Sequence, residues 1–275
     1  RRAGTPRPQS EIASVDAVLI DRVAAEDVSW WIGQELTAGR GRLLPGAREA
    51  SELAEGLSAI GVEADTTMAA AESILKGRVS AFGWTTLEVG ENPDWLRDPV
   101  SGGAWPQTFW ADVDFREADG LGDPRYVREV NRHHHLVTLG RAFALSGESR
   151  FAERVWRDIV SWVKVNPPLF GINWSSPLEV AIRLISWGMA LDLTGAHGAS
   201  EDDAALVTTS VSLQADHLSD NLSVYASSRN NHLIGEAAGL LVTGAKFPFL
   251  RSADRYASRG KVLLERELNA QVSAD

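Results

Sequence analysis

Residues 227–241, with the sequence SSRNNHLIGEAAGLL, place many polar groups at the start of an apolar helix. The guanidinium of Arg229, the amide of Asn231 and the imidazole of His232 can all donate hydrogen bonds. Glu236 lies four residues after His232, so the two share a helix face. Donors at a helix start suit a reaction in which negative charge grows on a bound group. The structural alternative is that an asparagine caps the helix and the other groups are solvated or half-buried.

A second polar face is predicted on a helix that begins after Ser176. Proline follows at the first helical position, and Glu179 stands where a capping box places its carboxylate. Glu179 and Arg183 are four residues apart, so a carboxylate and a guanidinium line up, and Trp174 lies just ahead of the cap. Arg183 either contacts a ligand or forms a helical ion pair with Glu179, which contributes roughly a few tenths of a kcal/mol.

The third group of candidates lies on a helix predicted over residues 124–146. Arg128, Arg132 and His135 follow one another at spacings of four and three, and Asn131 is adjacent. One face of this helix is therefore predicted to carry several hydrogen-bond donors.

The histidine run at residues 133–135 does not by itself predict a metal site. Successive helical residues point about 100° apart, so three adjacent imidazoles cannot bind one ion. A zinc site made from His135, His232 and Glu236 across helices is the remaining option, because two imidazoles and a carboxylate can hold zinc. Their spacing does not specify such a site, so we predict neither a metal nor a cofactor.

Composition limits the class of protein. The chain has 275 residues, of which 44% are hydrophobic, and its net charge is −10. An acidic chain repels polyanions at long range, so we predict no nucleic-acid partner, but local cations can still bind an anionic sugar within a Debye length of about 8 Å. The absence of cysteine excludes disulfides and thiol nucleophiles. No apolar run reaches bilayer length, so we predict no membrane insertion, and the oligomeric state stays open.

The polar groups must be positioned by helices, because helical patterns joined by short breaks fill most of the chain. We predict an all-α fold in which helices of this length, with Gly and Pro connections, form antiparallel hairpins. Residues 80–122 are expected to form a long irregular loop, because glycine and proline recur in them. The predicted helices cover residues 15–37, 46–61, 65–77, 124–146, 149–164, 177–194, 201–220, 231–244 and 251–270.

Four motifs follow one another: WLRDPVSGGAWP at 95–106, EVNR at 129–132, GINWSS at 171–176 followed by ExxxR, and NxHLxGE at 230–236. Together they resemble the N-terminal helical domain of the heparinase II/III family of polysaccharide lyases, which also includes alginate and oligoalginate lyases. The resemblance implies an incomplete (α/α) toroid. It divides the chain into a variable N-terminal helical leader at residues 1–80 and the main part of the toroid domain at residues 81–275.

The resemblance also implies a reaction, which is β-elimination in a uronic-acid-containing polysaccharide or oligosaccharide. In it Asn231 and His232 neutralise the uronate carboxylate, and Arg183 contacts the sugar acid. A secreted or periplasmic location is favoured, although the first residues, RRAGTP, show no signal-peptide pattern. The other expected substrate-binding residues are Arg132, Asn131, His135, Trp174, Glu179, Arg229 and Glu236.

One part of the family pattern has no match. The family's catalytic tyrosine follows the NxHLxGE segment by some tens of residues, and none of Tyr126, Tyr225 and Tyr256 fits its motif. We therefore expect this chain to be an incomplete fragment that lacks the tyrosine, the end of the toroid and the C-terminal β-sandwich, and to be inactive alone.

Two other classes of protein stay open. A non-catalytic carbohydrate-binding helical domain would bind the sugar without cleaving it. An (α/α)-toroid glycoside hydrolase would need two carboxylates, for which Glu179, Glu236 and Asp98 are the candidates. The products separate the three classes: a lyase leaves an unsaturated, ultraviolet-absorbing sugar end, a hydrolase leaves a reducing end without it, and a binding domain leaves neither.

Overall fold

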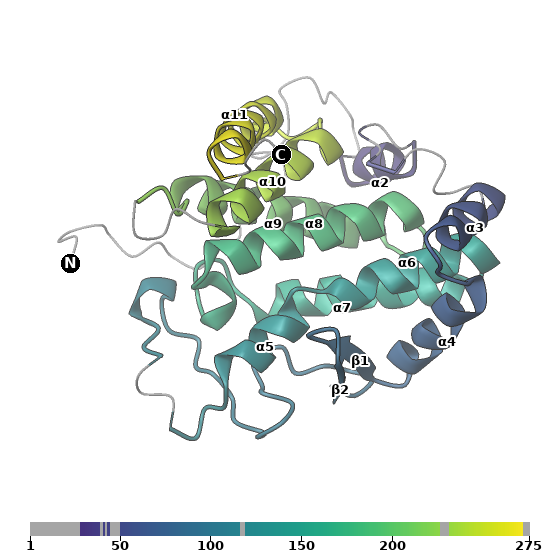
Figure 1. The fold of residues 1–275 in the computed structure, drawn as a ribbon, viewed down its shortest axis with the longest axis horizontal. Helices are drawn as coiled ribbons and strands as arrows, with labels where there is room; N and C mark the ends of the chain where they lie inside the picture. Colours follow the sequence, from purple (N-terminus) through teal and green to yellow (C-terminus); the bar gives the residue numbers. More distant parts are fainter. Residues whose placement is uncertain are drawn as a thin grey trace.

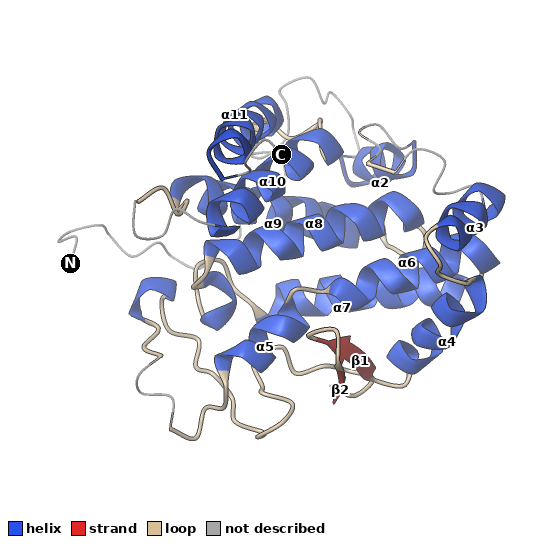
Figure 2. Cartoon of the chain, viewed as in Figure 1, coloured by secondary structure: helices blue, strands red, loops and turns tan. Residues whose placement is uncertain are grey.

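The computed structural model describes residues 28–38, 41, 43–44, 50–115, 119–225 and 231–271. Helices dominate it, and the strands in this described part form one small hairpin (Figures 1 and 2). The predicted all-α class is confirmed. The α-helices are α2 (Val28–Ala38), α3 (Ala50–Ala59), α4 (Ala64–Leu75), α5 (Pro124–Asn131), α6 (His134–Ser146), α7 (Ser149–Val165), α8 (Pro177–Thr194), α9 (Glu201–Asp220), α10 (Asn231–Lys246) and α11 (Ala253–Gln271). The remaining elements are β1 (Arg78–Ala81), β2 (Thr85–Glu88) and the 3-10 turns η1 (Trp110–Asp112) and η2 (Ile172–Trp174).

Local signals set most of the helix boundaries. α8 starts with Pro177, and α9 follows Ser200, whose hydroxyl accepts a hydrogen bond from the Asp203 N–H at 3.1 Å within a capping box. Both helices have the predicted bounds. α10 continues past Gly244, where we predicted its end. The glycine instead allows α11 to approach, because a Cβ there would lie 2.4 Å from the carbonyl oxygen of Ala253.

The helix predicted over residues 124–146 is divided in two, because His133 has a left-handed backbone with a φ of 60°. The His133 ring is buried, and its Nδ1 accepts a hydrogen bond from Trp187 Nε1 at 2.7 Å. This break separates α5 from α6. The prediction that Arg128, Arg132 and His135 share one helix face is therefore wrong. His135 lies on α6, where its Nε2 is 3.3 Å from a carboxylate oxygen of Asp158.

Residues 80–122, predicted to be an irregular loop, begin inside the antiparallel hairpin of β1 and β2. The described residues after the hairpin contain little regular structure apart from η1. They are nevertheless held in place by the buried carboxylate of Asp98, which accepts hydrogen bonds from the backbone N–H groups of Val100 at 2.8 Å and Asp123 at 2.9 Å. Asp98 therefore connects this loop to the start of α5.

Close contacts at two glycines show how α8 and α10 are arranged. A Cβ added at Gly235 would lie 2.6 Å from Leu178, and one added at Gly239 would lie 2.7 Å from Ala181. The contacts advance in the same direction along both helices, so α8 and α10 are parallel neighbours. Their N-termini consequently lie at the same end of the molecule.

α6 lies on the other side of α8 and runs in the same direction, since His133 meets Trp187 and Gly140 meets Ala190. Short connections return the chain through α7 and α9, so each helix of this row has an antiparallel partner (Figure 1). Alternating parallel and returning helices are the arrangement of an (α/α) toroid. We call the end that holds the N-termini of α6, α8 and α10 the site end.

We predict that Gly260→Ala destabilises the fold, because its Cβ would lie 2.5 Å from the backbone nitrogen of Leu241 and 2.6 Å from the carbonyl oxygen of Ala237. α10 and α11 would have to separate, which lowers the free energy of unfolding by about 1–3 kcal/mol. Gly56→Ala on α3 is the matched control, because nothing lies within 4 Å of its new Cβ. We expect this control to raise stability by up to about 1 kcal/mol in urea unfolding. Equal stability of the two variants would contradict the close contact.

Candidate functional site

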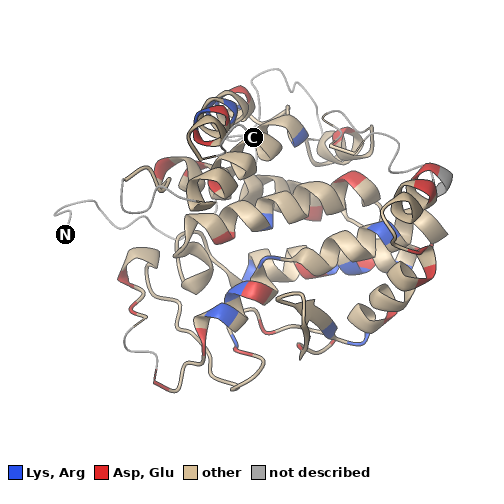
Figure 3. Cartoon of the chain, viewed as in Figure 1, with Lys and Arg blue, Asp and Glu red and all other residues tan. Residues whose placement is uncertain are grey.

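A chain of ion pairs joins α5 to α8 at the site end. The guanidinium of Arg132, at the end of α5, binds both carboxylate oxygens of Glu179 at 2.7 and 2.9 Å. It also donates to Glu129 at 2.7 Å. The hydrogen bonds that Arg132 donates to Glu179 are the largest cause that raises the pKa of Arg132 above its ordinary value. Figure 3 shows basic and acidic residues adjacent on α5.

These ion pairs correct the predicted capping box at the start of α8. Ser176 is the N-cap residue, as expected, but its side chain makes no capping hydrogen bond. Glu179 does not turn back to the helix start, because its carboxylate is bound by Arg132 from another helix. A charge-assisted, two-point contact with a guanidinium is stronger than a single bond to a backbone N–H.

Arg128 is a cation of a different kind, because it forms no ion pair in the part of the chain that the structure describes. Its guanidinium donates to the Ser175 hydroxyl at 3.3 Å and lies 4.6 Å from the centre of the Phe115 ring. Its Nε is buried and has no hydrogen-bond partner among the described residues. Burial is the main cause that lowers the pKa of Arg128. The half-buried group at the site end can therefore bind an anion.

Sequence reasoning placed Arg128 on a helix face but did not include it among the expected substrate-binding residues. The signal that distinguishes it from Arg132 is the location of nearby carboxylates. Glu129 and Glu179 both bind Arg132, and neither bonds to Arg128. Only the folded structure shows this difference.

Asn231 and His232 are exposed at the first turn of α10, at the same end as the arginines of α5. The N-terminus of a helix carries a partial positive charge, which favours a bound anion. Arg229, also expected here, lies outside the described residues. The structure therefore places Asn231 and His232 at the site end, where Arg128 and Arg132 also lie.

Glu236, expected to bind substrate, is buried and has another contact. Its carboxylate accepts hydrogen bonds from both the backbone N–H and the hydroxyl of Ser223, each at 2.7 Å. Glu236 thus fixes the segment that leaves α9 against α10, just after the catalytic candidates. His135 is likewise paired with Asp158, and among the described residues no group of three or more such side chains is placed to hold a metal ion.

Arg183 lies in the interior, with none of its side chain exposed. It donates to Gln214 Oε1 at 2.8 Å and to the carbonyl oxygens of Asn173 at 3.0 Å and Asn131 at 3.5 Å. Its guanidinium also lies 4.2 Å from the centre of the Trp162 ring. Burial lowers the pKa of Arg183 to about 9, so it remains charged at neutral pH. The expected contact with a sugar acid is thus replaced here by contacts inside the protein.

Asn131 and Trp174 are buried beside Arg183. The amide of Asn131 donates to the carbonyl oxygen of Trp95 at 2.9 Å and accepts from Trp162 Nε1 at 2.7 Å. We call Asn131, Trp174 and Arg183 the floor of the site, because they support the segment before α8 from within. In this structure the floor positions other groups and is not exposed.

His217 supports the floor from α9, and sequence reasoning missed it. Its Nε2 lies 2.9 Å from the carbonyl oxygen of Trp174, to which it donates. The rings of Trp110 and Trp174 contact it edge-on, at 5.0 and 5.5 Å between centroids. Burial lowers the pKa of His217 to about 4, so the imidazole is neutral at pH 7. No local pattern in α9 identifies this residue, because its partners come from distant segments.

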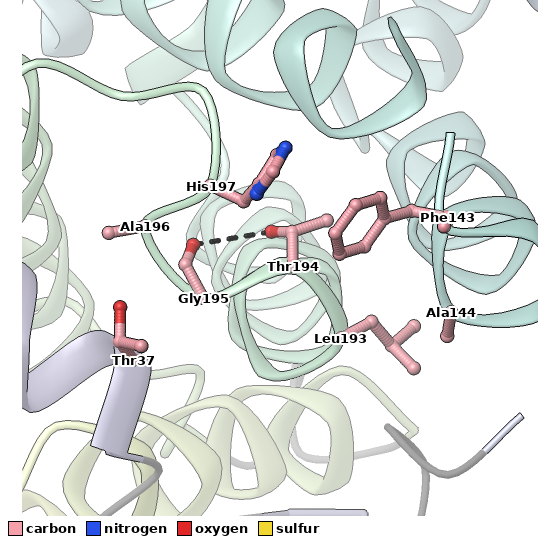
Figure 4. Close-up of a pocket in the computed structure, with 9 residues that line it drawn as sticks. Thr37, Phe143, Ala144, Leu193, Thr194, Gly195, Ala196 and His197 are labelled. Atoms are coloured by element: carbon pink, nitrogen blue, oxygen red, sulfur yellow. Dashed lines mark hydrogen bonds between the residues drawn. The ribbon is translucent and has the colours of Figure 1, made fainter. Parts of the chain in front are cut away.

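A hollow of about 450 Å³ lies at the opposite end of the helix row, near the C-termini of α6 and α8 (Figure 4). Of its described lining residues, only His197 can ionise. The Thr194 hydroxyl there donates to the carbonyl oxygen of Ala190 at 3.0 Å and also lies 3.3 Å from that of Gly195. With so few charged groups, this hollow is less suited to an acidic ligand than the site end.

The geometry defines a class of protein, which is an (α/α) helical domain with cations and amide donors at one end of its parallel helices. Residues 47–275 match the family described as Heparinase II/III N-terminus. The chain therefore belongs to the heparinase II/III family. Among the described residues, no helix is both long and apolar enough to cross a membrane.

Two curated relatives are each named heparin-sulfate lyase. The one from Bacteroides stercoris is 26% identical over 188 residues, which are 61% of this chain and 28% of the relative. The one from Bacteroides thetaiotaomicron is 24% identical over 155 residues, which are 54% of this chain and 22% of the relative. The chain thus spans about a quarter of the length of these relatives.

Solved structures share the fold. The heparan sulfate lyase HepC from Pedobacter heparinus is 19% identical, with a TM-score of 0.61 over 90% of this chain and 35% of that chain. A heparinase III gene product with methylated lysines is also 19% identical, with a TM-score of 0.61 over 99% of this chain and 42% of that chain. These similarities confirm the predicted helical architecture.

We predict that His217→Gln makes stability less sensitive to acid. The pKa of His217 is about 4 in the folded chain and 6.5 ordinarily, so between these values the unfolded chain binds a proton that the folded chain does not. Stability is therefore lost as the pH falls. Glutamine can still donate to the Trp174 carbonyl, but it does not titrate. Between about pH 7.5 and about pH 4.5 the variant should lose roughly 2–3 kcal/mol less stability than the wild type in urea unfolding. Parallel pH profiles of the two proteins would contradict the neutral, buried state of His217.

Proposed function

We propose that this chain is part of a polysaccharide lyase that cleaves a uronic-acid-containing polysaccharide by β-elimination. One observation carries the proposal: the parallel row of helices brings Asn231 and His232 to the same end as Arg128 and Arg132. The heparin-sulfate lyases among its relatives support a sulfated, acidic glycan as the substrate class. We also propose that residues 81–275 form the main part of the toroid domain and residues 1–80 a variable leader.

The proposed reaction removes a proton from the carbon next to the uronate carboxylate. Negative charge then moves onto that carboxylate, and donors that are already in place lower the barrier. The Asn231 amide and the His232 imidazole supply these donors, and the N-terminus of α10 adds its partial positive charge. The bond to the leaving oxygen then breaks as a carbon–carbon double bond forms, and the oxygen takes up a proton. The sugar end that remains is unsaturated.

Tyr256 is unsuited to be the base in this reaction. Its hydroxyl donates to an Asp216 carboxylate oxygen at 2.8 Å, and the ring is buried. Burial, with the negative charge of Asp216, raises the pKa of Tyr256 to about 12. A phenol with so high a pKa is rarely in the form that accepts a proton.

The three carboxylates that we considered for a glycoside hydrolase are each bound by other groups of the chain. Glu179 binds Arg132, Glu236 binds Ser223, and Asp98 binds backbone N–H groups. A hydrolase needs one carboxylate that carries a proton and another that reaches water or the sugar. The geometry therefore favours a lyase over a hydrolase.

We predict that Asn231→Ala and His232→Ala each lower kcat by about 100-fold or more in the complete gene product, because each removes one donor to the developing charge. KM should change far less, since the interaction strengthens mainly in the transition state. The measurement is the ultraviolet absorbance of the unsaturated ends released from heparan sulfate.

Asp254→Ala is the control for this experiment, because Asp254 is an exposed polar residue in the first turn of α11, which lies beside Gly244 of α10 and so away from the site end. It should leave both constants unchanged. If Asn231 only supports the start of α10, its removal would cost about 1 kcal/mol of stability and leave kcat near the wild-type value, and the proposed role would then be rejected.

We predict that Arg128→Gln weakens binding of a heparan sulfate oligosaccharide by about 10- to 100-fold, the effect of losing a charge-assisted hydrogen bond. Arg125→Gln is a matched control on the same helix, because Arg125 is exposed and already paired with Asp123 at 2.6 Å. Titration calorimetry at low and high salt measures both variants. Equal affinities for the two variants would show that Arg128 has a structural role and does not bind the glycan.

A further inference from the structure

The tip of the β1–β2 hairpin presents an exposed tryptophan. Trp84 is 76% exposed, the highest value among the large hydrophobic residues that the structure describes. The turn that carries it, residues 82–84, contains Phe82 with a φ of 55° and Gly83 with a φ of 77°. A left-handed phenylalanine is costly unless its surroundings hold it in place.

Contacts from α5 hold this turn. The Phe82 N–H donates to Glu129 Oε1 at 2.9 Å, and its ring meets Tyr126 edge-on with 5.5 Å between centroids. The Trp84 ring lies nearly parallel to Phe82, at 6.0 Å and 24°. The exposed indole is therefore fixed by the backbone below it and by a neighbouring ring.

The same carboxylate links the hairpin tip to the candidate site. Glu129 accepts the Phe82 N–H with one oxygen and binds Arg132 with the other, at 2.7 Å. Arg132 in turn binds Glu179 at the start of α8. The exposed tryptophan and the site end are thus connected through a single side chain on α5.

The surface around Trp84 is polar. Along the hairpin, Val79, Ala81 and Leu87 are buried, whereas the residues that alternate with them are exposed. The exposed positions pair across the strands as Arg78 with Glu88 and Ser80 with Thr86. Apart from this one ring, the hairpin exposes little apolar area that an apolar protein surface could bury. A sugar ring, with C–H groups on its face and hydroxyls at its edge, can stack on the indole and bond to the hydroxyls.

We propose that Trp84 is the stacking platform of an outlying subsite, which binds a pyranose ring of the polysaccharide away from the bond that is cleaved. The inference rests on the proposed function, since the ligand is another part of the same glycan chain. Ser80 and Thr86, which are paired and exposed on the same hairpin, supply hydroxyls for the sugar. Through Glu129 the platform is held in a fixed position relative to Arg132, so a glycan bound at the site end extends onto it.

The test compares Trp84→Ala and Trp84→Phe in the complete gene product. On heparan sulfate polymer, Trp84→Ala should raise KM about three- to tenfold with kcat unchanged, because stacking on an aromatic ring contributes mainly to binding. On the shortest oligosaccharide that is cleaved, KM should stay at the wild-type value, since this substrate does not reach the hairpin. Trp84→Phe should recover most of the affinity for the polymer. Val262→Ala, which alters an exposed residue on α11, should change neither constant.

Three outcomes would overturn the inference. KM for the polymer could be unchanged in Trp84→Ala, KM could rise equally for both substrates, or acrylamide quenching could show that Trp84 is shielded before ligand is added. Failure of the proposed function gives a different result, which is no unsaturated product from the wild type. In that case calorimetry with heparan sulfate tests the role of Trp84. Weaker binding by Trp84→Ala than by the wild type supports the platform, and equal binding by the two proteins rejects it.

Discussion

The buried charge of Arg183 is the constraint on which the site depends. Its donors reach Gln214 of α9 and the carbonyl oxygens of Asn131 and Asn173, while its guanidinium lies on the ring of Trp162 from α7. No carboxylate among the described residues bonds to it, so oxygen dipoles and one aromatic face must replace the water that it loses. An unsatisfied cation in the interior costs several kcal/mol. The end of α5, η2, α8 and α9 are therefore placed together by one group, which fixes the start of α8.

The positions of charged side chains outside the floor follow from this placement of α8. Because α8 starts at a fixed point, Glu179 binds Arg132 and does not bond to Arg128. The left-handed backbone of His133 contributes as well, since it ends α5 and turns the chain so that α6 can lie along α8. Burial lowers the pKa of His133 well below its ordinary value, so the ring sits neutral among tryptophans. A charged ring at that position would face Arg183 across the core.

The net charge of −10 does not describe the site end. Acidic residues there form ion pairs with basic residues of the chain, as Glu129 and Glu179 do with Arg132. In the described part of the chain, the groups that stay available for a ligand are Arg128, which forms no ion pair there, the amide of Asn231 and the N-termini of parallel helices. Glycines at 235 and 239 make this possible, because they let α10 lie close to α8 and bring the two helix starts together.

The sequence by itself determined what depends on near neighbours. Pro177 and Ser200 set the starts of α8 and α9, helical periodicity gave the all-α class, and the polar groups at the start of α10 marked Asn231 and His232. The tertiary structure decided which polar groups are exposed and which are paired. Glu179 bonds to a residue 47 positions away, Trp187 bonds to His133 across 54 positions, and Arg183 reaches Gln214 across 31. Spacing along one helix cannot show such partners, because they are chosen by how helices pack and by the cost of leaving a buried polar group without a bond.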